Sequence, residues 1–484
     1  MSTKVFERSG AVMKLVPAWN VIEPLMGGTL AMREAGERLL PRFPSEDATA
    51  WTRRKDAATL FPALKRTVRV LASKPFSKPI TLSDETPPEI VEWANDIDRE
   101  GVNLHTFAAE MLAEALAYGL AGILVDAPPV AEPGKVQTKA QQQAEGRRPY
   151  WVRVRHNQIL GWRVEQVEGR TRLTMLRLAE PAEVADGEWG TKIVERVRVL
   201  RPGSWEIWEK QEKAAGVEGE AEWKRTESGL SGVEEITFVP LYGARKGFMD
   251  AESPLIDLAH LNVKHWQKQS DQDNIEHCAC VPILVATGFA DTDDIPIGAS
   301  TAIKSSNPDA KVQWCELQGS SIKEGKDSLS ALEDQMLQCG AELLVKKPGS
   351  RTATEDANDA EANKSDLQRI TEGFEDALDT ALKFTAAYVK KDEGGKVTLF
   401  KDFGAALLSD ASAQLVLSLQ QGGLISKPTA IKELQRRGTL SADIDPEEEA
   451  EAVAAEGPAL AEVDDDPADP EEKAEPPEPE KEAA

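Results

Sequence analysis

The chain has 484 residues, 41% of them apolar and 29% charged, a composition typical of a soluble globular protein with several domains. No run of 18 apolar residues occurs and the N-terminus lacks an apolar signal core, so we expect neither a membrane span nor a secretory leader. The four cysteines favour free thiols in a reducing compartment over a disulfide framework: Cys278, Cys280, Cys315 and Cys339.

The net charge of −26 is concentrated at the C-terminal end. Residues 441–484 carry eighteen Asp and Glu against Lys473 and Lys481, which leaves −10 for the other 440 residues. This tail is rich in Pro and Ala and has almost no large apolar side chains, so we expect it to be disordered. An acidic chain is a poor static binder of nucleic acid, because affinity comes from neutralising phosphates. It would suit a surface along which DNA moves without sticking.

The N-terminal half begins with predicted helices. Residues 51–72 have a helical pattern that Pro62 interrupts, and residues 88–118 predict two helices, the second ending at Gly119. The run 123–128 (ILVDAP) then predicts a short buried strand. A polar, flexible loop is expected after it, over residues 129–149.

Residues 150–240 alternate apolar and polar residues with period two. Turns that contain glycine separate the alternating runs. This pattern predicts an antiparallel meander with one solvated face. Within it, residues 211–233 are expected to form a long hairpin connection.

Residues 253–277 predict a helix with Ser253 as N-cap and Pro254 at the first helical position. Its second half offers only Trp266 and Ile275 as large apolar residues. A helix that is polar nearly all round bridges solvent or packs against polar copies of itself. We therefore expect this helix to need partners.

A small β element and a second helix follow. Residues 281–289 and 311–319 predict two strands, and residues 328–344 predict a helix. A basic loop then leads to residues 356–391, where apolar residues recur on one helical face. Thr352 and Glu355 form a capping box that would start this helix. Since nothing stops it before Gly394-Gly395, we predict about 38 residues and a length of about 57 Å.

The C-terminal part predicts one strand and two helices. The strand covers residues 396–403, and the helices cover residues 406–421 and 427–438. Gly422 and Gly423 end the first of these helices.

Catalytic motifs are absent from the sequence. It has no G-x-x-x-x-G-K-[ST] loop, no H-E-x-x-H and no G-x-S-x-G, and five histidines leave little material for acid–base chemistry. Asp126, at the end of ILVDAP, is therefore interpreted as a strand end rather than a magnesium ligand. We predict no catalytic residue, no cofactor and no enzyme activity.

Two groups of residues resemble metal ligands but lack the full pattern. His277, Cys278 and Cys280 have no second pair of ligands nearby, as zinc would need, so they more readily mark a change from helix to strand. Asp291, Asp293 and Asp294 lack the glycine and the bidentate glutamate of an EF-hand, which favours a solvated turn. No metal site is predicted.

One region is basic, and three interpretations of it stay open. The arginines could lie on exposed strand faces paired with Glu from neighbouring strands, form a subunit interface with acidic surfaces, or bind nucleic acid. The interface is favoured over nucleic acid, because single-strand readers interleave aromatic residues and this region does not. The residues include Arg147, Arg148, Arg153, Arg155, Arg163, Arg170, Arg172 and Arg177.

These elements, in this order, resemble the portal proteins of tailed bacteriophages. The resemblance covers about residues 50–455 and rests on five stretches. They are DIDREGVNLHTFAAEML followed by GLAGILVDAP, RRPYWVRVRHNQILGW, FVPLYGARKGFMDAESPLIDLAHLNVKHWQKQSDQDNIEH with VPILVATG, RTATEDANDAEANKSDLQRI, and LSLQQGGLISKPTAIKELQRRGTLSADIDPEEEAE.

The resemblance implies an α+β portal fold and a ring of typically twelve subunits at one capsid vertex, with DNA passing through its axis. It also implies a division of the chain: an N-terminal segment (1–50), wing (51–250), first stem helix (251–278), clip of small α/β type (279–326), second stem helix (327–345), tunnel loop (346–355), long helix with a wing strand (356–404), crown (405–440) and acidic tail (441–484).

The same resemblance implies the partners and the site. The expected partners are further copies of the chain, double-stranded DNA in transit, terminase, a major capsid or scaffolding protein and a head–tail adaptor, in a virion assembled in the host cytoplasm without a membrane. Lys346, Lys347 and Arg351 would contact DNA phosphates from the tunnel loop. The alternative for these three residues is a helix C-terminus carrying cations that favour its dipole. The alternative functions are a minor head protein, an adaptor or a packaging nuclease.

Overall fold

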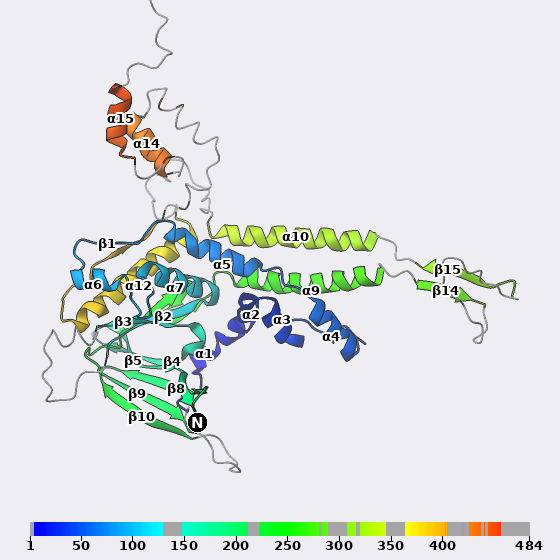
Figure 1. The fold of residues 1–484 in the computed structure, drawn as a ribbon, viewed down its shortest axis with the longest axis horizontal. Coiled ribbons are helices and arrows are strands. Elements are labelled where there is room, and N and C mark those ends of the chain that lie inside the picture. The colour runs from blue at the N-terminus through cyan, green and yellow to red at the C-terminus, as the bar shows by residue number, and fades with distance from the viewer. Residues whose placement is uncertain are drawn as a thin grey trace, which may run out of the picture. The chain divides into compact units, whose positions relative to one another are not determined.

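A computed structural model describes most of the chain: residues 4–128, 148–167, 169–211, 222–279, 283–288, 307–315, 320–344, 364–401, 425–436 and 444–455, with the single residues 403, 418, 420 and 440. The chain divides into two compact units, Met1–Lys401 and Asp402–Ala484. Figure 1 shows the helices and strands, which mix antiparallel sheets with α-helices. The predicted α+β class is confirmed at this level.

The N-terminal segment is built from short helices that pack beside a long one. They are α1 (Gly10–Met13), α2 (Val16–Gly27), α3 (Thr29–Glu34), a 3-10 turn η1 (Gly36–Arg38) and α4 (Ala48–Ala57). Both α2 and α4 contact α9 (Ile256–Ala279).

The helices predicted over residues 51–118 are confirmed. They are α4, then α5 (Ala63–Ser73) with η2 (Lys74–Phe76), α6 (Pro88–Trp93) and α7 (Leu104–Tyr118). The Asn103 side chain caps α7 by accepting a hydrogen bond from the Thr106 N–H at 2.8 Å. Gly119 ends α7 with a φ of 85°, a left-handed conformation that glycine adopts readily.

A three-stranded antiparallel sheet lies at the centre of the first unit. Its order is β11 (Phe238–Tyr242), β2 (Leu120–Asp126) and β3 (Tyr150–Val154). Both α7 and α12 (Asp366–Tyr388) contact β2 and β11. The predicted buried strand at 123–128 is thus confirmed, with bounds three residues earlier at its start.

A five-stranded antiparallel sheet confirms the meander. Its order is β10 (Trp223–Leu230), β9 (Ser204–Lys210), β8 (Arg196–Arg201), β5 (Arg170–Ala179) and β4 (Ile159–Val167), and the 3-10 turn η3 (His156–Gln158) precedes β4. The connection predicted over 211–233 is wrong for its second part, since β10 pairs there with β9 along its length.

Four smaller strand pairs complete the sheets of the part of the chain that the structure describes. β6 (Ala182–Asp186) pairs with β7 (Gly190–Val194), β12 (Ala244–Gly247) with β13 (Asp250–Glu252), β14 (Ile283–Thr287) with β15 (Lys311–Cys315), and β1 (Thr81–Leu82) with β16 (Val397–Thr398). Of the strand predicted over 396–403, only the two residues of β16 are a strand among the described residues. β14 and β15 have five residues each, and residues 281, 282, 289 and 316–319 of the strands predicted over 281–289 and 311–319 lie outside the described residues.

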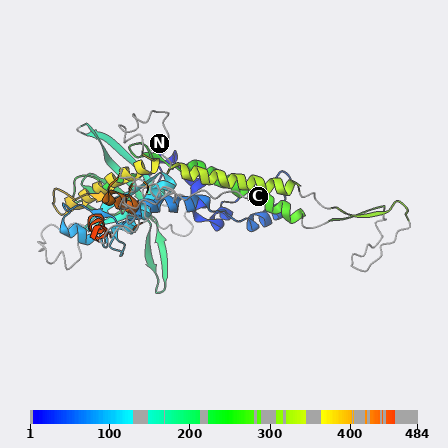
Figure 2. The ribbon, with the colours of Figure 1, turned by 90° about the horizontal axis from the view of Figure 1, so that it is seen from above.

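Two long helices, α9 and α10 (Ser320–Glu342), lie side by side (Figures 1 and 2). Their contacts pair early residues of one with late residues of the other, so they run antiparallel. The predicted first residues are wrong: α9 begins at Ile256 rather than Pro254, and α10 begins eight residues before the expected residue 328. Ser253 Oγ still accepts a hydrogen bond from the Leu255 N–H, as expected of an N-cap serine, and it donates to the Leu116 carbonyl.

The predicted helix of about 38 residues is also wrong. The helix α12 has 23 residues, about 35 Å, because Ser365 in extended conformation caps its start. Ser365 and Gln368 form the capping box there, with Gln368 N–H donating to Ser365 Oγ at 3.3 Å. The box predicted at Thr352 and Glu355 lies outside the described residues.

The second unit contains α14 (Lys427–Arg436) and α15 (Pro446–Ala455). The helix predicted over 427–438 is confirmed, whereas most of the one predicted over 406–421 lies outside the described residues. Full disorder of the tail 441–484 is wrong for α15. Asp445 accepts hydrogen bonds from the Glu447 and Glu448 N–H groups, and an acidic first turn suits a helix N-terminus.

Candidate functional site

The predicted DNA-contacting residues Lys346, Lys347 and Arg351 lie outside the described residues. The structure does fix both ends of their segment. The Leu367 N–H donates to the Leu343 carbonyl at 3.0 Å, which joins the start of α12 to the end of α10. The described residues on the two sides of positions 345–363 therefore lie next to each other.

The contact between α9 and α10 combines a polar seam with a small apolar one. His265 Nε2 lies 3.0 Å from Glu333 Oε1, and Lys268 Nζ donates to Ser328 Oγ at 2.6 Å. Gln272 Nε2 donates to the Ile322 carbonyl at 3.1 Å. The buried apolar residues of the two helices include Leu258, Ala259 and Trp266 on α9 and Leu329, Leu332 and Met336 on α10.

The outer surface of this helix pair is left partly apolar. Leu337 on α10 is 71% exposed and Ile275 on α9 is 42% exposed. Single exposed apolar residues are ordinary on protein surfaces. On two helices with so little apolar surface between them, they favour a further partner along the pair.

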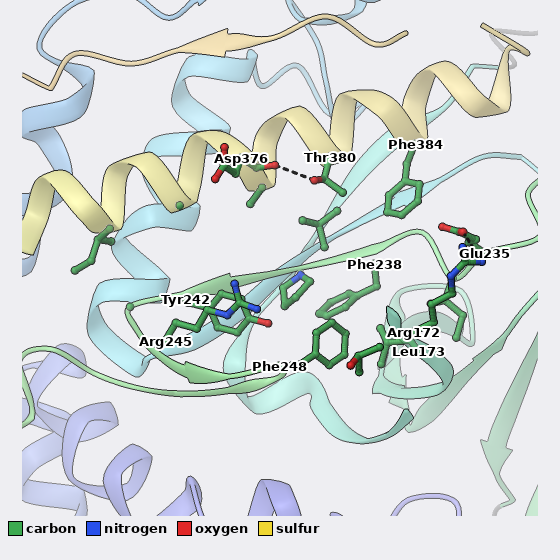
Figure 3. A pocket seen from close by; sticks show the side chains of 18 of the residues that line it. Arg172, Leu173, Glu235, Phe238, Tyr242, Arg245, Phe248, Asp376, Thr380 and Phe384 are labelled. Carbon is green, nitrogen blue, oxygen red and sulfur yellow. Dashed lines mark hydrogen bonds and ion pairs between the residues drawn. The ribbon is translucent and has the colours of Figure 1, made fainter. Parts of the chain in front are cut away.

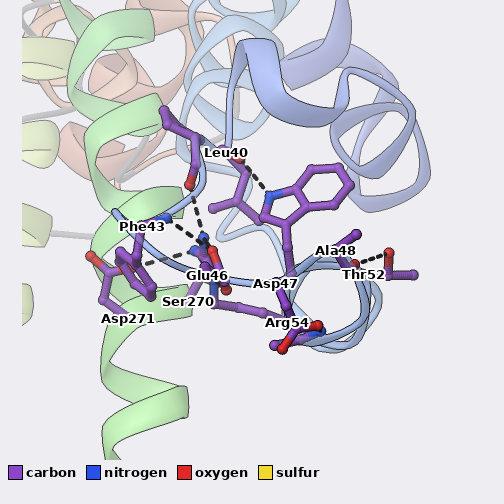
Figure 4. Close-up of polar contacts among 12 residues, drawn as sticks. Leu40, Phe43, Glu46, Asp47, Ala48, Thr52, Arg54, Ser270 and Asp271 are labelled. Atoms are coloured by element: carbon purple, nitrogen blue, oxygen red, sulfur yellow. Dashed lines mark hydrogen bonds and ion pairs between the residues drawn. The ribbon is translucent and has the colours of Figure 1, made fainter.

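A buried arginine fixes the N-terminal segment to α9 (Figure 4). Arg54 Nε and Nη2 donate to the two carboxylate oxygens of Glu46 at 2.8 and 2.9 Å. Nη2 also donates to the Pro41 carbonyl at 2.8 Å. On the α9 side, Arg54 Nη1 lies 3.4 Å from Ser270 Oγ and 3.5 Å from Asp271 Oδ1.

This arrangement shifts the two carboxyl groups in opposite directions. The hydrogen bond from Arg54 holds the pKa of Glu46 below its ordinary value. Burial raises the pKa of Asp271, and the charge of Arg54 opposes that rise. Glu46 is thus the main anionic partner of Arg54.

His156 is the buried group that most resembles an acid–base centre. Its Nδ1 lies 2.6 Å from Glu114 Oε1, and its Nε2 lies 3.0 Å from Glu23 Oε1. Its ring stacks on Tyr118 with centroids 3.5 Å apart. Both nitrogens are occupied by carboxylates of the same chain, so the arrangement joins η3 to α2 and α7 rather than presenting a free base.

Three of the eight arginines of the basic region pair with acids of the same chain. Arg148 pairs with Asp96 at 2.8 Å, Arg153 with Asp98 at 3.1 Å, and Arg172 with Glu235 at 3.0 Å. The Arg172–Glu235 pair agrees with the first interpretation, whereas Arg148 and Arg153 are mostly covered and pair with aspartates that precede α7. The proposed subunit interface is not tested by these contacts, and Arg147 lies outside the described residues.

Asp126 ends β2 in a polar cluster. Arg198 Nη1 donates to its Oδ2 at 2.6 Å, and the Tyr150 hydroxyl donates to the same oxygen at 3.2 Å. Burial raises the pKa of Tyr150 to about 12, and the charge of Asp126 adds to the rise. The ion pair satisfies this carboxylate within the fold, as expected of a strand end.

The candidate metal residues do not gather into a site among the residues that the structure describes, where no three His, Cys, Asp or Glu side chains are placed to share an ion. His277 lies exposed in the last turn of α9. Cys280, Asp291, Asp293 and Asp294 lie outside the described residues. Within the same part of the chain, no helix is both long and apolar enough to cross a membrane.

A groove of 1080 Å³ lies beneath α12 and is here called the α12 groove (Figure 3). Segments far apart in the sequence line it: the start of β5, the strands β11 and β12, and one face of α12. Its aromatic side chains are Phe238, Tyr242, Phe248 and Phe384. Sequence reasoning missed this groove, because no local motif marks it.

The comparisons with known proteins give one partial family match and several similar structures. Residues 254–389, from the start of α9 through α12, match the family described as "Domain of unknown function (DUF4055)". The search of curated proteins finds no match. The chain is similar, at 12% identity and a TM-score of 0.38, to a chain of the solved "Virion of native gene transfer agent (GTA) particle", with 84% of this chain and 97% of that chain covered. A chain of the "Neck of empty GTA particle computed with C6 symmetry" is similar at 12% identity and the same TM-score, covering 81% and 95%. A third is from the "Neck of native GTA particle computed with C12 symmetry", at 10% identity and a TM-score of 0.38, covering 83% and 97%.

Proposed function

We propose that this chain is a portal protein: a structural subunit of a ring at one vertex of a virus-like particle, through which double-stranded DNA is packaged and released. The observation that carries the proposal is the antiparallel pair of α9 and α10. The strand pair β14–β15 lies between these two helices in the chain. One backbone hydrogen bond, from the Leu367 N–H to the Leu343 carbonyl, joins the end of α10 to the start of α12. This order agrees with the portal resemblance of the sequence stretches.

Within this proposal each part of the chain has a role. α9 and α10 would form the stem, and β14 and β15 would form the clip. The elements of residues 51–250 would form the wing, and residues 405–440, which include α14, would form the crown. The clip would meet terminase and later the adaptor proteins, and the wing would face capsid or scaffolding protein. The chain would be located in a virion, as are the similar chains from the gene transfer agent particle.

The physical support is the apolar surface that the helix pair leaves exposed to water. α9 and α10 share a polar seam and expose Leu337 and Ile275. Neighbouring copies arranged head to tail around an axis would cover such a surface, and a rotation that closes gives a ring. Twelve copies is the number expected from the portal resemblance.

Negative-stain images and mass photometry of the purified chain test the proposal. We expect closed rings with a central hole. Monomers and dimers alone at micromolar concentration would overturn it. The proposal also requires no catalysis, so ATP hydrolysis or DNA cleavage that a point substitution in this chain abolishes would count against it.

A further inference from the structure

The β6–β7 hairpin projects from the first unit without support. It continues directly from β5 and β8, and none of the residues Ala182–Val194 is buried. Figure 2 shows it as a teal hairpin that extends away from the body, at the lower edge of the view. An isolated two-stranded hairpin is at best marginally stable in water. This hairpin, here called the arm, therefore needs a partner surface.

The arm also carries apolar side chains where a partner could reach them. Trp189, in the turn at its tip, is 90% exposed, and Ile193 on β7 is 74% exposed. An aromatic side chain removes roughly 150–250 Å² from water when it is buried. Trp residues that anchor an interface lie in well-packed pockets at its centre. Trp189 has the exposure of such an anchor before binding.

The α12 groove is a suitable receptor for the tip. Its volume of 1080 Å³ exceeds what one side chain fills, and aromatic residues from β11 and α12 line it. On its rim Arg172 and Arg369 have carboxylate partners in Glu235 and Asp366. Arg245 lies over the Tyr242 ring at 5.1 Å and has no ion pair among the described residues.

The charge at the tip is opposite to that of Arg245, which lies in a lining that also holds Glu234 and Asp376. Asp186 ends β6 and Glu188 lies in the turn that presents Trp189, and both are exposed. If Trp189 enters the groove, one of these carboxylates can meet Arg245. An ion pair at the edge of an interface fixes orientation and partner choice more than it adds affinity.

The arm cannot reach the groove of its own chain. The groove lies at the start of β5, where Arg172 and Leu173 line it, whereas the arm begins beyond Ala179 at the other end of that strand. At about 3.4 Å per residue, the seven residues from Arg172 to Ala179 alone span about 24 Å, and the arm extends from the far end. Donor and receptor therefore lie at opposite ends of one sheet, the arrangement that a head-to-tail contact needs.

We infer that the arm of one copy inserts Trp189 into the α12 groove of the next copy and so links neighbouring subunits. For its role in assembly this inference rests on the proposed ring, because a head-to-tail contact repeated with a rotation that closes gives a ring, while the contact itself can be measured separately.

A photocrosslinking experiment locates the contact. A benzophenone amino acid replaces Trp189, and ¹⁴N-labelled and ¹⁵N-labelled full-length chains are mixed before irradiation. We expect cross-links between light and heavy chains that map to residues 238–248 or 366–384. Rings that form while cross-links map elsewhere, or only within one chain, would overturn the arm and leave the ring standing. A chain that stays monomeric and gives no mixed cross-link overturns both, whereas groove cross-links without rings would support the arm and overturn the ring.

Substitutions give a second measurement. Trp189→Ala is expected to weaken assembly at least tenfold in mass photometry with an unchanged melting temperature. Leu230→Ala, which removes a 75% exposed side chain from edge strand β10, should change assembly less than twofold. Arg245→Glu should weaken assembly, and adding Glu188→Lys should restore at least part of it. Assembly that Trp189→Ala leaves intact, or a charge exchange that rescues nothing, would contradict the insertion.

Discussion

Arg54 holds the N-terminal helices on α9, and because it is buried, this contact should be sensitive to substitution. Its side chain is 4% exposed and that of Glu46 is 8% exposed. Removing one partner of a buried ion pair leaves the other charge without compensation, which costs about 3–5 kcal/mol. We expect Arg54→Ala to lower the free energy of unfolding by about 3 kcal/mol in urea titrations.

Arg42→Ala is the matched control for that substitution. Arg42 pairs with Glu37 at 2.5 Å, but the two side chains are 40% and 55% exposed. Exposed pairs contribute between about 0 and 1 kcal/mol. Equal losses for Arg54→Ala and Arg42→Ala would mean that burial adds nothing to the Arg54 contact.

The same pair gives a pH dependence whose sign is fixed. The hydrogen bond from Arg54 lowers the pKa of Glu46 in the folded chain. A carboxyl group with a lowered folded pKa contributes stability above its unfolded pKa, and this contribution is lost as pH falls through the folded pKa. The difference in unfolding free energy between the native chain and Glu46→Gln should therefore be constant from pH 6 to 8 and shrink below about pH 4.5. A difference that grows on acidification would contradict this assignment.

At the scale of elements, the junction between α7 and β2 depends on one glycine. A Cβ at Gly119 would lie 2.4 Å from the Glu252 carbonyl carbon and 2.6 Å from the Ser253 nitrogen, and the φ of 85° adds strain. Gly119→Ala must therefore move the chain that leads into α9. We expect a loss of soluble folded protein, or of at least about 3 kcal/mol of unfolding free energy.

Gly101→Ala separates the two causes in that prediction. Gly101 has a φ of 91°, yet a Cβ there would meet nothing within 4 Å. This variant should lose only the conformational part, about 1–2 kcal/mol. If Gly119→Ala and Gly101→Ala lower the free energy of unfolding by the same amount in parallel urea titrations, the close approach of the backbone at Gly119 is unimportant.

Periodicity predicted those elements that bury one face. The alternation in residues 150–240 predicted the meander because β5 and β8 carry buried residues such as Leu176 and Val199. It missed β10, an edge strand in which no residue is buried, since hydrogen bonds to β9 hold it rather than an apolar face. The predicted start of the long helix was wrong for a related reason. Apolar residues recur at helical spacing on the N-terminal side of Ser365 as well, so only the capping serine shows where α12 starts.

The candidate surfaces were less predictable than the elements. The α12 groove joins β5, β11, β12 and α12, which lie up to about two hundred residues apart, and aromatic residues such as Phe238 and Phe384 have no sequence motif in common. The Arg54 contact spans 216 residues to Ser270. In the basic region the charges were visible in the sequence, but their partners were not.

At the scale of the whole molecule, we expect the acidic C-terminal end to contribute to stability up to the end of α15 and to be dispensable beyond it. Leu434 and Ala430 of α14 are buried in a small cluster with Ile425 and Leu440, and Gln435 Nε2 donates to the Ile444 carbonyl. Deleting residues 457–484 leaves all of these contacts, so ring assembly should be unchanged by mass photometry. Deleting residues 440–484 removes Leu440 and α15 and should lower the melting temperature. Loss of assembly in the shorter deletion would assign the tail a role in the ring.

Lys346, Lys347 and Arg351 should act on DNA in transit rather than on assembly. A backbone hydrogen bond from the Leu367 N–H to the Leu343 carbonyl joins the end of α10 to the start of α12, and none of these three side chains takes part in it. Three cations per subunit, repeated around a ring, would offer weak phosphate contacts, and the acidic remainder of the chain would keep the average attraction low. Changing all three to Ala should leave rings intact and reduce the packaging or retention of DNA in a complementation assay. Lys390→Ala with Lys391→Ala, which removes two cations at the other end of α12, is the matched control and should package normally. Normal packaging by the triple variant would favour the alternative, cations that only stabilise a helix C-terminus.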